Sequence, residues 1–63
     1  MAQVKGWPVG ERVEIFHVDH AGRMGVVVGA ALPYGGFVLQ AVRVLGTQDV
    51  LLLVPSVEFG WPL

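Results

Sequence analysis

The densest group of side chains that could carry chemistry is formed by His17, Asp19 and His20. Imidazole and carboxylate groups are ligands for zinc and nickel, so the spacing suggests a metal site. In an extended chain, however, His17 and Asp19 lie on one side and His20 on the other, and three ligands from one chain form an incomplete set. We therefore expect a solvated turn in which Asp19 accepts hydrogen bonds from backbone N–H groups, with a metal site as the alternative.

Covalent catalysis finds little support in the sequence. Ser56 is the only serine, Glu58 is its only acidic neighbour, and there is no cysteine nucleophile. A capping role suits Ser56 better. His17 or His20 could act as a general acid or base near neutral pH, but no nearby motif positions a substrate. The glycines fit neither a phosphate-binding loop nor a dinucleotide fingerprint. We expect no catalytic residue and no cofactor.

Composition favours a small domain that associates with other chains. The chain has 63 residues, of which 54% are hydrophobic and only 14% are charged. A domain of this size buries only about 60% of the surface that its unfolded chain exposes, so its stability margin is small. Without cysteine, disulfides and thiolate zinc sites are excluded. Association with further copies is then the main means of stabilisation, and a metal held by histidines is the weaker option.

Charge and hydropathy also count against two classes of partner. The net charge is −1, with four dispersed lysine and arginine residues, which is a poor basis for binding phosphates, so we expect no nucleic-acid partner. No apolar run approaches the roughly 20 residues of a membrane span. The N-terminal residues also lack the apolar region of a signal peptide, and we therefore predict a cytoplasmic protein with no membrane partner.

Strands, not helices, must position these residues. Nine glycines and four prolines leave no uninterrupted window with a helical apolar period. Five strands are predicted, over residues 12–18, 24–30, 37–45, 50–54 and 59–63, with a loop at 31–36, a tight turn at 46–49 and a 3-10 turn at 55–58 before the last strand. Residues 1–8 form an N-terminal arm, and residues 9–63 form the barrel.

The two-residue period of strands also predicts the core. The alternating apolar positions chosen for it are Val13, Ile15, Val26, Val28, Val42 and Val44.

Two motifs resemble those of SH3-like and KOW domains. The segment GERVEI at residues 10–15 is similar to the opening motif of these domains, and GRMGVV at residues 22–27 is similar to the stretch that follows it. The resemblance covers residues 9–61 and implies an all-β, five-stranded SH3-like barrel. It implies a fold and no particular activity, because barrels of this shape bind peptides, RNA, small molecules or one another.

The order of elements also resembles that of plasmid-encoded type II dihydrofolate reductases, small barrels that work as tetramers around a central pore. The similar stretch is VLLLVP at residues 50–55. The family's glutamine falls on Leu52 and its tyrosine on Val54, so the polar groups that hold ligands in the pore are missing. The resemblance therefore implies a barrel oligomer and none of the chemistry.

Aromatic residues offer a possible ligand surface. The tripeptide Gly-Trp-Pro occurs at residues 6–8 and again at 60–62. The SH3-like resemblance implies that the first and last strands are close, so Trp7 and Trp61 should be near each other. Together with Tyr34 they could receive a proline-rich peptide or a nucleobase. The interpretation that we favour is that the tryptophans plug one end of the barrel or a seam between subunits.

The predicted fourth strand indicates self-association. Residues 50–54 do not alternate between apolar and polar, as a strand with one face in water should. We expect Leu51 and Leu53 to face outward and to form an interface with Phe37 and Leu39, although the opposite register would exchange the two faces. The function predicted is a non-enzymatic, homo-oligomeric interaction module, with a protein or peptide as a further partner. A small-ligand binder or pore enzyme at a symmetry axis is the alternative, and a KOW-like RNA or ribosome binder is the second.

Overall fold

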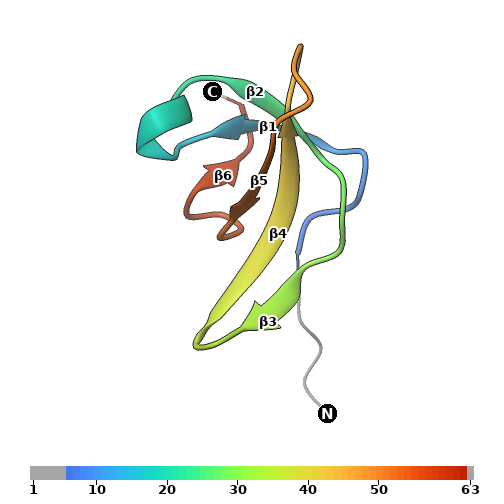
Figure 1. Cartoon of the computed structure of the whole chain (residues 1–63), viewed down its shortest axis with the longest axis vertical. Helices are drawn as coiled ribbons and strands as arrows, with labels where there is room; N and C mark the ends of the chain where they lie inside the picture. Colours follow the sequence, from blue (N-terminus) through green and yellow to red (C-terminus); the bar gives the residue numbers. More distant parts are fainter. Residues whose placement is uncertain (1–5, 63) are drawn as a thin grey trace.

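Glycine-rich turns divide residues 6–62, the part that the computed structural model describes, into six short strands and one 3-10 helix. In chain order the elements are β1 (Arg12–Ile15), η1 (Val18–His20), β2 (Met24–Val27), β3 (Leu32–Tyr34), β4 (Phe37–Val44), β5 (Val50–Leu53) and β6 (Phe59–Gly60). The strands form one antiparallel sheet in the order β3-β4-β2-β1-β6, and β5 pairs with β4. The sheet curls into a half-barrel around its inner face (Figure 1).

The long strand β4 organises the sheet because three other strands pair with it. β2 pairs with its C-terminal half, where Val27 lies opposite Val42, and β3 pairs with its N-terminal half, where Leu32 lies opposite Leu39. The chain advances five residues from Val27 to Leu32, but only three from Leu39 to Val42. The two additional residues bulge out between β2 and β3, as they do in tightly curled sheets.

The strand count differs from the five that we predicted. β3 lies within residues 31–36, for which Pro33 and two glycines predict a loop. Pro33 is compatible with the strand because it lies opposite Val38, where the backbone nitrogen points away from β4 and no ladder hydrogen bond is lost. Gly35, with φ of 61°, and Gly36 then form the two-residue turn between Tyr34 and Phe37.

The 3-10 helix is also not where we predicted it. Within the described residues it occupies Val18–His20, at the end of the predicted first strand. Residues 55–58 form a turn in which the N–H groups of Val57 and Glu58 both donate to the carbonyl of Val54. Ser56 has φ of 65° in this turn, a left-handed conformation that a 3-10 helix does not allow.

The inner face of the sheet carries the core. Its buried apolar residues are Val13, Ile15, Val27, Val42, Val44, Leu53 and Phe59. Four of the six predicted core residues are confirmed, but Val26 is half-buried and Val28 is exposed. Val27 faces inward instead, together with Gly25, where a Cβ would approach Val42 Cγ1 to 2.6 Å. Three consecutive valines carry no alternation, so the sequence pattern could not choose between the two faces.

Among the described residues, no helix has the length and apolar character needed to cross a bilayer.

Candidate interaction surface

The two faces of β5 are the reverse of those we predicted. Leu53 is only 3% exposed and belongs to the core, and Leu51 packs against the core from its margin. Val50 and Leu52 point outward, and Leu52 is 64% exposed. The assignment of Leu51 and Leu53 to an outward face is therefore wrong, and the opposite register holds. The pairing of β5 with β4 explains it, because Leu51 lies opposite the buried Val42 and so shares its face.

Apolar side chains cover the outer side of β3, β4 and β5. Residues directly opposite each other in the sheet share a face, and so do alternate residues along one strand. The pairs Tyr34 with Phe37, Leu32 with Leu39 and Ala41 with Leu52 therefore lie on one side of the sheet. We call this surface the outer apolar face, and its members are Val28, Leu32, Tyr34, Phe37, Leu39, Ala41, Val50 and Leu52.

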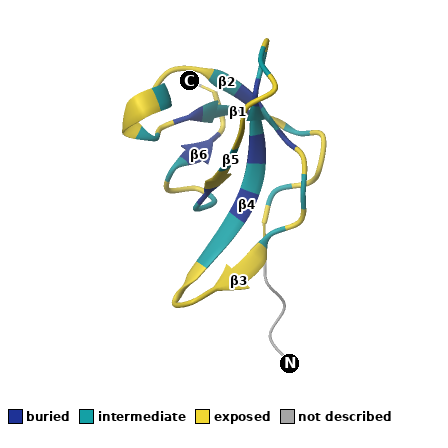
Figure 2. Ribbon diagram, in the orientation of Figure 1, coloured by how far each residue is buried: buried dark blue, intermediate teal, exposed yellow. Residues whose placement is uncertain are grey.

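The described chain leaves most of the outer apolar face uncovered. Tyr34 and Phe37 are 72% and 67% exposed, and they form the cross-strand pair next to the turn of the β3–β4 hairpin. This hairpin projects at one end of a chain whose principal extents are 37 × 22 × 22 Å, and its strand β3 is exposed throughout (Figure 2). Leu39 is half-buried, so of the four predicted interface residues only Phe37 is fully available.

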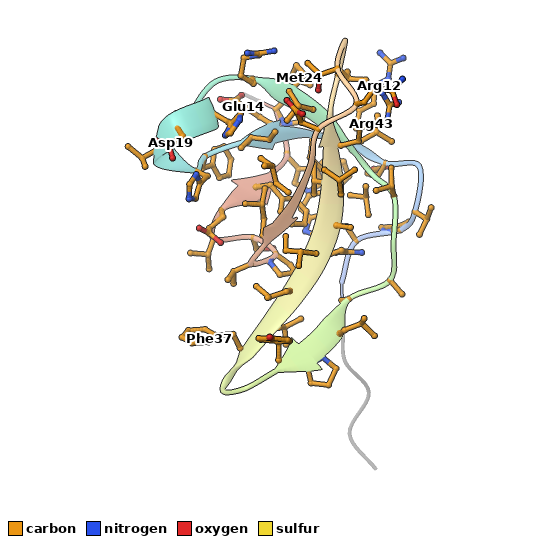
Figure 3. The ribbon with its side chains drawn as sticks, viewed as in Figure 1. Arg12, Glu14, Asp19, Met24, Phe37 and Arg43 are labelled. Carbon is orange, nitrogen blue, oxygen red and sulfur yellow. The ribbon has the colours of Figure 1, made fainter. Side chains whose placement is uncertain are left out.

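Charged side chains lie at the opposite end of the same sheet. Val26 of β2 lies opposite Arg12 of β1 on one side and opposite Arg43 of β4 on the other. Phe37 lies at the far end of the sheet from these two arginines (Figure 3). The Arg43 guanidinium also donates to the carbonyl of Thr47 at 3.1 Å. The outer side of the sheet is therefore divided into a charged end and an apolar end.

The two tryptophans meet, and Tyr34 lies elsewhere. The ring centroids of Trp7 and Trp61 are 4.5 Å apart in an edge-to-face arrangement, and Trp7 also lies 5.9 Å from Phe59. Within residues 6–62, Tyr34 has no ring contact with either tryptophan. A three-residue aromatic surface of Trp7, Tyr34 and Trp61 is therefore not assembled within one chain. Beside Trp7, Gly6, Pro55 and Ser56 line an open pocket of about 210 Å³, and the Trp7 indole N–H donates to Ser56 Oγ at 3.4 Å.

Gln40 is a structural residue that our sequence reasoning missed. Its side chain is 1% exposed and lies on the inner face of β4. Its Oε1 accepts a hydrogen bond from the backbone N–H of Trp7 at 2.9 Å. Its Nε2 donates to the backbone carbonyls of Trp7 and Gly29 at 2.7 and 2.8 Å. The amide thus ties the chain at Trp7 to the bulge between β2 and β3.

The histidine cluster does not gather three ligands. His17 Nε2 lies 3.9 Å from Glu58 Oε2, and the rings of His17 and His20 are 6.4 Å apart. No group of three potential metal ligands occurs within residues 6–62. Main-chain bonds hold the turn, since the His20 N–H donates to the His17 carbonyl at 2.9 Å, whereas the Asp19 carboxylate accepts no hydrogen bond from the described residues.

No protein-family model matches the chain, and no curated protein or solved structure is significantly similar to it. The outer apolar face and the docked tryptophans are therefore interpreted from their geometry and chemistry.

Proposed function

We propose that this chain is a non-enzymatic assembly module, an SH3-like barrel that forms a homo-oligomer through its outer apolar face. The observation that carries the proposal is the continuity of this face over three strands, with Tyr34, Phe37 and Leu52 each about two-thirds exposed. Contiguous apolar patches on small proteins generally mark interaction sites. A second copy is the expected partner because a chain of 63 residues has a small hydrophobic core, and this one has no cysteine for disulfides.

The energy available from this face is comparable to the cost of association. Complete burial of one large apolar side chain contributes about 1.5–3 kcal/mol, so covering what is exposed of Tyr34, Phe37 and Leu52 offers about 1–2 kcal/mol each. A symmetric interface doubles the number of side chains. The gain then reaches about 6–12 kcal/mol, within the range of about 4–15 kcal/mol that association costs. Burial of side chains on this face is therefore of the size that association requires.

The alternatives have weaker support. In the resemblance to type II dihydrofolate reductases, Leu52 and Val54 replace the polar residues that hold ligands, and these positions offer no hydrogen-bonding side chain to a substrate. An RNA-binding role would rest on Arg12 and Arg43, which flank a single valine and do not form an extended basic surface. A peptide partner at the Trp7 pocket is compatible with self-association because that pocket is built from other residues.

Single charge substitutions test the proposal. Lysine at residue 52 or residue 37 places a charge on the outer apolar face without disturbing the core, so the variants Leu52→Lys and Phe37→Lys should stay folded and have a lower mass in solution. The matched control is Val18→Lys, since Val18 is 82% exposed but lies in η1, outside this face. Light scattering after gel filtration gives the masses. The proposal fails if both outer-face variants keep the oligomeric mass of the wild type.

A further inference from the structure

The edge of β5 that faces away from β4 has no strand beside it within the described residues. The Val44 N–H donates to the Asp49 carbonyl at 2.9 Å, which fixes the alternation of the ladder between these strands. The main-chain groups of Leu51 and Leu53 therefore point toward β4. Those of Val50 and Leu52 point to the open edge, where residues 6–62 provide no partner for them.

This edge lacks the features that usually prevent a free strand from pairing. Natural sheets protect their edges with short strands, prolines, bulges or charged side chains. The four residues of β5 include no proline or charged side chain, whereas the other edge strands are shorter, since β3 has three residues including Pro33 and β6 has two. The open edge ends after Leu53, because the Val54 N–H donates to Glu58 Oε1 at 2.9 Å and Pro55 follows.

We propose that β5 pairs in antiparallel fashion with β5 of a second copy, about a two-fold axis at Leu51. The inference rests on the proposed self-association and specifies how it is achieved. Val50 of each copy then lies opposite Leu52 of the other, and the two pairs exchange about four N–H···O bonds. This register uses only the unpartnered groups of Val50 and Leu52. A shift by two residues in one direction would require the Val54 N–H, which Glu58 already occupies.

A second copy fits this edge better than an unrelated peptide strand. β5 is complementary to itself in the antiparallel direction, so the same residues serve both sides of a two-fold interface. Edge pairing also places the exposed side chains of Val50 and Leu52 of one copy directly beside Leu52 and Val50 of the other, on the outer side of the joined sheet. A peptide strand would satisfy the backbone of β5, but β5 itself already carries the apolar side chains that match Val50 and Leu52.

Two variants of Leu52 separate edge pairing from packing of side chains alone. Leu52→Pro removes the N–H that points to the open edge and leaves the ladder to β4 intact, whereas Leu52→Ala shortens the side chain and keeps the N–H. Sedimentation equilibrium should give a dissociation constant at least about tenfold higher for Leu52→Pro than for Leu52→Ala, because each proline removes an interchain hydrogen bond. Equal constants for the two folded variants would overturn edge pairing and leave the proposed oligomer standing. A monomeric wild type would remove both.

Amide hydrogen exchange of the wild-type chain decides the matter if Leu52→Pro does not fold. Edge pairing predicts that the amides of Val50 and Leu52 become at least about tenfold more slowly exchanging as concentration rises through the dissociation constant, with Val18 as an exposed reference. Amides that exchange equally fast in the monomer and the oligomer would overturn the inference. A Leu51→Cys variant tests the register, since the only cysteine of that chain would meet its counterpart at the axis and form an interchain disulfide on oxidation. Failure of the folded variant to cross-link would overturn the axis at Leu51.

Discussion

Replacing Gln40 with leucine would remove the buried amide that ties Trp7 to the bulge at Gly29. The side chain is 1% exposed and makes three hydrogen bonds of 2.7–2.9 Å. Each such bond contributes about 0.5–1.5 kcal/mol net, and a buried group left without a partner costs about 1–3 kcal/mol. Leucine retains apolar contact, and the chain at Trp7 can move into water. We therefore expect Gln40→Leu to lose about 2–4 kcal/mol of stability, close to the whole margin of about 3–5 kcal/mol for a domain of this size.

Thermal and urea unfolding followed by circular dichroism measures this loss. A loss of this size should lower Tm by about 10 °C or more in a chain of this length. The near-ultraviolet signal should weaken as well, because the contact between Trp7 and Trp61 depends on the docked position of Trp7. The matched control is Gln48→Leu, at an exposed glutamine in the β4–β5 connection. A Tm for Gln40→Leu within about 2 °C of the wild type would refute the role assigned to this amide.

Three further predictions follow from the faces of the sheet. Val27→Asp should prevent folding because it buries an unpaired charge, whereas Val28→Asp should keep a cooperative melt; the reverse result would contradict the assigned faces. Gly25→Ala should cost about 1–3 kcal/mol because the added methyl group would collide with Val42 and with backbone, while Gly36→Ala, where a Cβ meets nothing within 4 Å, is its control in urea unfolding. Fluorescence anisotropy with labelled RNA and DNA should detect no submicromolar binding at physiological salt, and tight, salt-sensitive binding would contradict the reading of the charges.

Alternation of residue types made parts of this fold predictable. The strand predicted at residues 37–45 corresponds to β4, because its outward Arg43 alternates with the inward Val42 and Val44. The tight turn after it was marked by Gly46, which has φ of 81°. Gln40 has the same parity as Val42 and Val44, so the alternation already placed it inside. We missed it because an isolated glutamine resembles a solvent-facing residue.

Uninterrupted apolar runs were the source of the errors in the faces of the strands. Residues 26–28 and 50–54 contain only valine and leucine, and a shift of one residue exchanges their faces without changing the pattern. Long-range pairing decides the matter, through the close packing of Gly25 against Val42 and the pairing of Leu51 with Val42. A single sequence does not contain these contacts. The outer apolar face was therefore expected on β5, but it was assigned to the wrong leucines.

Sedimentation equilibrium of the wild-type chain, from low to high micromolar concentration at neutral pH, tests self-association most directly. The chain has a mass of 6.8 kDa, and circular dichroism of the same samples would establish that it is folded. The account predicts a mass of at least two chains at the upper end of this range, falling as the protein is diluted. A folded chain that keeps the mass of a single copy at the highest concentration would contradict it.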